Sequence, residues 1–278
     1  MNRRVVITGM GAVSPLGLSV EETWDGLMHG RSGVALVDAF STDEYPSRMA
    51  AQVKGFDAAN YLDRKEARRM ARFTQFAAVA LAEALRQAGL DLQKEDRDRV
   101  GLQVGSAIGA IPIIEEQALI LHRDGPRRIN PTFVPTVIVS AAPCHIAVLH
   151  GIHGPTAAPA AACATGIVAL GEAARWLERG DVDVVLAGGT EAAMTPLALA
   201  AFGRLGALSA RNDDPAHACR PFDVSRDGTV MGEGAAMLVL ETADHAQRRG
   251  AAVLAEVLGF GFSEDGFHIT APEPTGEG

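Results

Sequence analysis

The feature that most constrains the fold is an alternation of short aliphatic runs with longer segments of helical periodicity. Compact apolar runs, bounded by glycine or polar residues, predict strands at residues 5–8, 100–104, 183–187, 236–240 and 253–262. Helical patterns separate most of these strands. Alternating strands and helices favour a layered α/β fold with a mostly parallel sheet and helices on both faces.

Capping residues indicate where several helices begin and end. Ser19 and Glu22 form a capping box that opens one helix. A second, longer helix is predicted over residues 63–88, with Gly89 as its stop. Another helical pattern begins immediately after Cys163. These helices are amphipathic, so each is expected to cover one face of the sheet.

The segment 107–139 interrupts the alternation. It contains Pro112, Pro126, Pro131 and Pro135, and its apolar pattern is weak. We therefore expect irregular structure here, which covers a site or a partner surface.

Charge and cysteine content exclude several classes of protein. The formal net charge of −9 argues against a general nucleic-acid binder. No uninterrupted apolar run is long enough to span a bilayer, and the N-terminal run is too short for a signal peptide. The three cysteines show no paired spacing, so we expect no disulfide framework and a reducing cytoplasm.

Cys163 is the strongest candidate for chemistry. Small residues surround it, and a helix pattern starts directly after it. A thiol at a helix N-terminus meets unpaired N–H groups and the positive end of the helix dipole, which favour the nucleophilic thiolate. The alternative is a small buried packing residue, the role we expect for Cys144.

Two other clusters are candidate sites. His145, His150 and His153 follow Cys144, but no CxxC and no carboxylate accompany them, so a zinc site is weakly supported. A basic cluster lies on one side of a predicted helix, and a second basic spot follows it. Two interpretations are open: a solvated helix face, or a docking surface for an acidic protein or a phosphate group. These residues are Arg64, Lys65, Arg68, Arg69 and Arg72, with Arg127 and Arg128.

Six groups of motifs together resemble the β-ketoacyl–acyl carrier protein synthases, most closely the type II condensing enzymes of bacterial fatty acid synthesis. The resemblance covers essentially the whole chain. The matching stretches are residues 5–11, 162–166, 187–191, 209–213, 220–223 with 226–228, and 259–261 through 268–272.

The resemblance implies a thiolase-like fold with layers α-β-α-β-α, built from two similar halves and assembled as a homodimer. On that basis residues 1–250 would form the N-terminal ketosynthase half. Residues 251–278 would be the first strand region of an incomplete C-terminal half.

The resemblance also implies the reaction. Cys163 would take an acyl group from the phosphopantetheine of acyl carrier protein, and its backbone N–H would serve the oxyanion hole. Malonyl-carrier protein would then lose CO₂, and its carbanion would attack the thioester in a decarboxylative Claisen condensation. No bound cofactor and no metal are expected.

Further positions are assigned only through this resemblance. Five match the family's acyl pocket: Ile108, Phe133, Val134, Ala162 and Phe202. Five match its carrier-protein docking face: Lys65, Arg68, Arg69, Arg127 and Arg128. His268 and Thr270 match the pantetheine tunnel.

Departures from the family pattern limit the expected activity. The family's two catalytic histidines stand in a His-Gly-Thr loop and a Gly-His loop, and neither motif occurs in this sequence. We therefore expect a C-terminally truncated synthase that does not complete condensation alone. A polyketide ketosynthase, or an inactive partner or fragment, are the alternatives.

Overall fold

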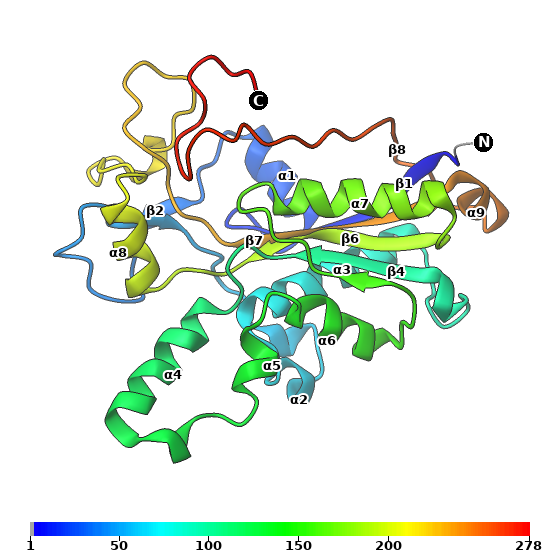
Figure 1. Ribbon diagram of the computed structural model, residues 1–278, viewed down its shortest axis with the longest axis horizontal. Coiled ribbons are helices and arrows are strands. Elements are labelled where there is room, and N and C mark those ends of the chain that lie inside the picture. The colour runs from blue at the N-terminus through cyan, green and yellow to red at the C-terminus, as the bar shows by residue number, and fades with distance from the viewer. Residues whose placement is uncertain (1–2) are drawn as a thin grey trace.

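A computed structural model describes residues 3–278, and its centre is one six-stranded sheet (Figure 1). The strand order is β5-β4-β6-β7-β1-β8. In chain order the strands are β1 (Val5–Val13), β4 (Val100–Gly105), β5 (Thr156–Ala157), β6 (Val184–Glu191), β7 (Gly234–Thr242) and β8 (Ala255–Val257). Two further strands, β2 (Val34–Leu36) and β3 (Met49–Ala51), form a separate antiparallel ribbon.

The sheet is mixed, so the expectation that its strands pair mostly in parallel is wrong. β4 pairs in parallel with β5 and β6, whereas β6–β7, β7–β1 and β1–β8 are antiparallel. β7 and β8 run the same way but lie on either side of β1. Alternation along the chain indicates crossover connections, but it does not say which strand is inserted between two others.

Helices cover both faces of the sheet, as expected. α3 (Arg72–Ala88) and α6 (Ala141–His150) lie on one face, and α7 (Thr165–Arg179) lies on the other (Figure 1). The fully buried side chains of Phe73, Phe76 and Leu81 lie in the core beneath α3. Leu177 is equally buried beneath α7. The strands β4 and β6, which lie between these two helical layers, are therefore almost entirely buried on both faces.

The remaining helices lie around this core. They are α1 (Val20–Met28), α2 (Arg64–Ala67), α4 (Ile111–Asp124), α5 (Phe133–Val137), α8 (Pro196–Arg204) and α9 (Ala243–Arg248). Short 3-10 turns are η1 (Ala58–Asn60), η2 (Arg97–Arg99), η3 (Pro126–Arg128) and η4 (Pro215–His217). Within residues 3–278, none of the helices is both long enough and apolar enough to cross a membrane.

The helix predicted over 63–88 is broken into α2 and α3. Asp63 caps α2 by accepting from the backbone N–H groups of Lys65 and Glu66 at 2.8 and 3.2 Å. The backbone then becomes extended at Ala71, whose ψ is 158°. The Gln75 amide donates to carbonyls in the break, so the interruption leaves them satisfied. Apolar periodicity continues across the break, which is why the pattern predicted one helix.

The segment 107–139 is largely helical, so the expectation of irregular structure is wrong. Its main element is α4, and Pro112 lies in the first turn, where a missing N–H costs nothing. The Gln117 side chain accepts a hydrogen bond from the Asn130 N–H at 2.8 Å. This bond ties the loop that leads back toward the sheet to α4. Figure 1 shows the resulting arm, residues 111–137, reaching away from the sheet. Two of its large apolar side chains, Leu119 and Val134, are each 65% exposed.

The strand expected over 253–262 is limited to β8. Beyond it the chain crosses over α7 in extended form (Figure 1). The Phe260 ring packs against Gly171, where any side chain would collide with it, and the Arg175 guanidinium lies 5.1 Å from the ring centroid. Aromatic packing on α7, rather than strand pairing, therefore directs this part of the chain.

Candidate active site around Cys163

Cys163 lies in an exposed turn that leads directly into the N-terminus of α7. A residue that served only for packing would be buried, so its exposure favours the chemical role. Ala162, immediately before it, has a φ of +46°, a conformation that non-glycine residues rarely adopt. Strain of this kind occurs at functional turns because the surrounding structure imposes it. The turn therefore presents the thiol to solvent at the positive end of a 15-residue helix.

Thr165 fixes the shape of this turn. Its buried hydroxyl donates to the Ala162 carbonyl at 2.7 Å and accepts from the Ala161 N–H at 2.8 Å. No side chain provides the ordinary N-cap contact at Ala164. No role was predicted for Thr165 from the sequence. The sequence does hold a signal for this role: Thr165 is a small hydroxyl residue at the start of a predicted helix that has no other capping residue.

The turn rests on the carboxyl ends of β4 and β6. A Cβ at Gly105 would lie 2.3 Å from the Thr165 methyl group and 2.5 Å from the Pro159 carbonyl oxygen. A Cβ at Gly189 would lie 3.0 Å from the Gly166 Cα. Glycine is required at Gly105 because the turn approaches its backbone directly, and a side chain at Gly189 would force Gly166 to shift slightly. Ligand sites in open α/β sheets commonly lie at this edge.

A half-buried carboxylate, Glu191, organises the neighbouring turn after β4. It accepts hydrogen bonds from the Ser106 hydroxyl at 3.2 Å, the Ala107 N–H at 2.9 Å and the Ile108 N–H at 3.2 Å. Burial raises the pKa of Glu191 above its usual value, although these hydrogen bonds oppose the rise. Glu191 belongs to a matching family stretch, but its contacts with residues 106–108 could not be read from the sequence.

The residues assigned to the acyl pocket are not all brought together within one chain. Ala162 adjoins Cys163, and Ile108 follows the end of β4 that supports the same turn. Phe133 and Val134 lie on α5, in the arm, while Phe202 lies on α8. Phe133 and Phe202 are half-buried. Their roles therefore stay predictions.

The basic residues assigned to docking are all exposed. Lys65 lies on α2, Arg68 and Arg69 lie in the break before α3, and Arg127 and Arg128 lie in η3. Arg69 forms an ion pair with Glu66 at 3.0 Å. A surface groove of about 420 Å³ runs beside α2 and is lined by Arg64 and Arg68 among others. Of the residues assigned to docking, Arg68 therefore lies at this groove.

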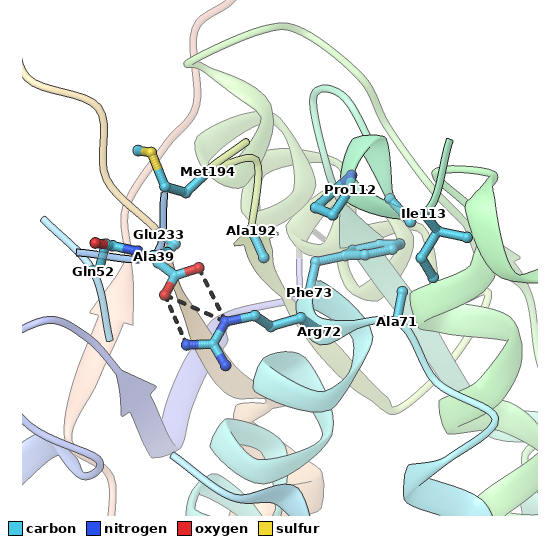
Figure 2. A pocket seen from close by; sticks show the side chains of 11 residues that line it. Ala39, Gln52, Ala71, Arg72, Phe73, Pro112, Ile113, Ala192, Met194 and Glu233 are labelled. Atoms are coloured by element: carbon cyan, nitrogen blue, oxygen red, sulfur yellow. Dashed lines mark hydrogen bonds and ion pairs between the residues drawn. The ribbon is translucent and has the colours of Figure 1, made fainter. Parts of the chain in front are cut away.

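Arg72 is a structural residue, contrary to its grouping with the surface cluster. Its guanidinium binds the buried carboxylate of Glu233 at 2.8 Å (Figure 2). It also donates to the Val53 carbonyl at 2.9 Å. It also lies 4.6 Å from the centroid of the Phe76 ring. This pair forms one wall of a cavity of about 310 Å³ whose other walls are mostly apolar, among them Phe73 and Met194.

The remaining cysteines and histidines lie elsewhere. Cys144 is exposed on α6, so the packing role expected for it is wrong; Cys219 is exposed as well. Burial lowers the pKa of His145 and His150 on the same helix. In the exposed C-terminal segment, the ring Nδ1 of His268 accepts from the Thr270 N–H at 3.1 Å. Among residues 3–278, no side-chain hydrogen bond joins Cys163 to a histidine.

Comparison with known proteins gives one consistent family. The model described as Beta-ketoacyl synthase, N-terminal domain, matches residues 2–246. A 3-oxoacyl-[acyl-carrier-protein] synthase 2 from Vibrio cholerae is 45% identical over 276 residues, covering 99% of this chain and 67% of the relative. The enzyme of the same name from Staphylococcus aureus is 46% identical over 277 residues, with 100% and 67% coverage.

Solved structures agree with this result. A β-ketoacyl synthase from Burkholderia phymatum superposes with a TM-score of 0.89 at 35% identity, over 98% of this chain and 67% of that one. The ishigamide ketosynthase/chain length factor superposes with a TM-score of 0.87 at 32% identity, over 99% of this chain and 67% of that one. A type II polyketide ketosynthase in complex with its acyl-carrier protein superposes with a TM-score of 0.82 at 32% identity, over 92% of this chain and 62% of that one. With a thiolase-like fold and a family model that spans most of its length, the chain belongs to the β-ketoacyl synthase family.

Proposed function

We propose that this protein is a β-ketoacyl–acyl carrier protein synthase of fatty acid elongation, with Cys163 as its nucleophile. The observation that carries the proposal is the exposed Cys163 turn at the N-terminus of α7, within a chain that belongs to this family. The Cys163 thiolate attacks the carbonyl carbon of an acyl thioester. The carbon–sulfur bond to the carrier then breaks, the pantetheine thiol leaves, and the acyl group stays on Cys163.

Fatty acid elongation is favoured over polyketide synthesis by the degree of similarity. The 3-oxoacyl-[acyl-carrier-protein] synthases 2 are 45–46% identical, whereas the ketosynthase from the type II polyketide complex is 32% identical. The acyl group would arrive on the phosphopantetheine of an acyl carrier protein, with His268 and Thr270 beside the pantetheine tunnel. Synthesis of this kind would place the protein in the cytoplasm.

Acylation of Cys163 tests the proposal directly. The chain is incubated with an acyl-carrier protein thioester, and intact mass is followed over time. One acyl adduct is expected on the wild type, on Cys144→Ala and on Cys219→Ala, and none on Cys163→Ala. The two control cysteines are also exposed, so they test whether the reaction is selective. Equal acylation of all three cysteines, or no adduct at all, would contradict the proposal.

Carrier-protein docking on the basic face is the second part of the proposal. Acyl carrier proteins present acidic surfaces, and complementary charge accelerates such encounters. Arg68→Glu should lower the acylation rate from carrier-bound substrate, with the largest effect at low salt, and leave acylation from a small soluble thioester unchanged. Arg248→Glu, an exposed change on α9, is the matched control. Equal losses with both substrates would exclude docking as the cause.

The arm is proposed as the surface for a second copy of this chain. The exposed large apolar side chains of the arm are Ile114, Leu119, Leu121 and Val134. Exposed apolar surface marks protein interfaces when it is extensive. Val134→Glu should shift the protein toward monomer in sedimentation velocity, whereas Val224→Glu, at a site that is 97% exposed outside the arm, should not. A monomeric wild type would overturn this part.

A further inference from the structure

Glu191 connects the site of chemistry with the residues assigned to the acyl pocket. Its Oε2 atom accepts from two consecutive N–H groups, those of Ala107 and Ile108, and its Oε1 atom accepts from the Ser106 hydroxyl. The same Ser106 oxygen accepts from the Gly109 N–H at 2.9 Å. One carboxylate therefore holds the whole turn after β4.

The turn is also fixed to the arm. The Ala110 N–H donates to the Val137 carbonyl at 3.2 Å, at the end of the helix that carries Phe133 and Val134. Gly109 has a φ of +74°, and a Cβ there would lie 2.6 Å from the same carbonyl oxygen. Movement of the turn would therefore move the base of the arm with it.

The turn also adjoins the nucleophile. Ser106 directly follows Gly105, whose backbone touches Thr165 and Pro159 on either side of the Cys163 turn. Glu191 itself ends β6, two residues after Gly189, which touches Gly166. Two glycine contacts thus hold the Cys163 turn on β4 and β6, and three hydrogen bonds to Glu191 separately hold the adjoining turn at Ile108.

We propose that Glu191 is a positioning residue that sets acyl-chain selectivity by fixing the backbone at Ile108. This rests on the proposed acylation of Cys163, and it assigns Glu191 no contact with the reacting atoms. Removing its carboxylate leaves the buried Ser106 hydroxyl and the N–H groups of Ala107 and Ile108 without their acceptor, so the turn rearranges. The acyl pocket proposed beside Ile108 then changes shape, which affects long acyl chains more than short ones. The thiol stays in place because its own turn is held by the glycine contacts with β4 and β6.

The test compares short-chain and long-chain acyl thioesters on the full chain. Glu191→Ala should change the ratio of long-chain to short-chain acylation rates about tenfold. Glu191→Gln keeps a carbonyl oxygen for the two N–H groups and an amide toward Ser106, so it should restore most of the ratio. Glu83→Ala is the matched control, because Glu83 likewise accepts from two backbone N–H groups, those of Ala12 and Val20, away from this turn.

A second readout separates this proposal from the proposed function. Alkylation of Cys163 by N-alkyl iodoacetamides of graded length reports the shape of the proposed pocket without any acyl transfer. If the wild type alkylates selectively but never acylates, the proposed function fails and the role of Glu191 is still measured. If Glu191→Ala keeps the wild-type length ratio in alkylation, or if Glu83→Ala changes it equally, the positioning role is overturned.

Discussion

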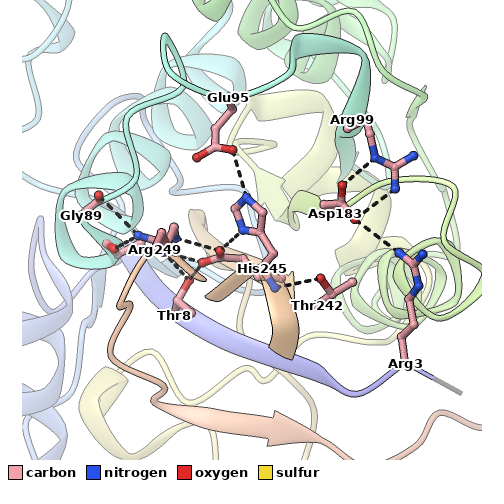
Figure 3. Close-up of polar contacts among 11 residues, drawn as sticks. Arg3, Thr8, Gly89, Glu95, Arg99, Asp183, Thr242, His245 and Arg249 are labelled. Carbon is pink, nitrogen blue, oxygen red and sulfur yellow. Dashed lines mark hydrogen bonds and ion pairs between the residues drawn. The ribbon is translucent and has the colours of Figure 1, made fainter. Parts of the chain in front are cut away.

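Arg249 donates through its guanidinium to both carboxylate oxygens of Glu241, whose side chain is completely buried (Figure 3). The Glu241 carboxylate also accepts from Thr8 on β1 and from the His245 ring. Arg249 donates in addition to the Ala88 carbonyl at 2.8 Å, at the end of α3. This single ionic cluster therefore fastens β1, β7, α3 and α9 together.

Removal of the Glu241 carboxylate should be strongly destabilising. Burial favours the neutral acid, but hydrogen bonds from Arg249, His245 and Thr8 outweigh it and lower the pKa of Glu241 to about 2. Glu241→Ala leaves Arg249, whose side chain is 18% exposed, without its carboxylate partner, and removing one partner of a buried pair costs about 3–5 kcal/mol. Urea denaturation should show this loss, and Asp244→Ala, an exposed neighbour, should stay within about 0.5 kcal/mol. A small effect at Glu241 would mean that the cluster is not a structural tie.

The contribution of His245 should depend on pH. The hydrogen bond to Glu241 raises the pKa of His245, burial opposes this, and a 3.0 Å contact with Glu95 adds to the rise. Arg249 and Asp183 are the other charged groups near the ring. Because the folded pKa is raised, the stabilisation is complete below about pH 6.5 and is lost as pH rises through the folded value.

The difference in unfolding free energy between wild type and His245→Gln should therefore shrink as pH increases above about 6.5. His217→Gln is the control, because His217 is exposed in η4 and its Nδ1 contacts only Asp214. A difference that stays constant across this range would show that charge on His245 does not stabilise the fold.

Gly11 should not tolerate a side chain. A Cβ there would lie 1.8 Å from the Ala80 carbonyl oxygen, so α3 packs directly on the backbone of β1. Gly11→Ala should lower the unfolding free energy by about 3 kcal/mol or more, because backbone must shift. Gly203→Ala, within α8 and with no atom near the added Cβ, should instead stabilise by about 0.5–1 kcal/mol. Thermal denaturation of the two variants measures both effects.

The 278-residue chain should load an acyl group without completing condensation. Decarboxylation of malonyl-carrier protein develops enolate charge, and the histidines that the family uses there have no counterpart motif in this sequence. Incubation with acyl and malonyl carrier proteins, followed by mass spectrometry, should show the Cys163 adduct and no β-ketoacyl product. Robust product formation would mean that other residues of this chain stabilise the enolate.

Much of the local structure followed from the sequence. The Ser19 hydroxyl caps α1 by accepting from the Glu22 N–H at 3.1 Å, as the capping box predicted. Gly89 ends α3 with a φ of +60°, and α7 begins directly after Cys163. Caps, stops and periodicity depend on neighbouring residues, so one sequence suffices to find them.

Contacts between distant residues could not be found in this way. Arg72 resembled its exposed neighbours on the predicted helix, but its partner, Glu233, lies 161 residues further along the chain. The insertion of β1 between β7 and β8 left no signal, because register and strand order depend on side chains from separate segments.

The sequence by itself determined the alternating strands and helices, the glycine and capping residues that bound them, and the family, and it predicted Cys163 as the nucleophile. Only the tertiary structure decided that the sheet is mixed, that segment 107–139 forms a helical arm, and that Glu191 holds the turn at Ile108. The physical reason is burial. A carboxylate gains a defined role when folding removes it from water, and the backbone groups that then satisfy it are chosen by packing rather than by proximity along the chain.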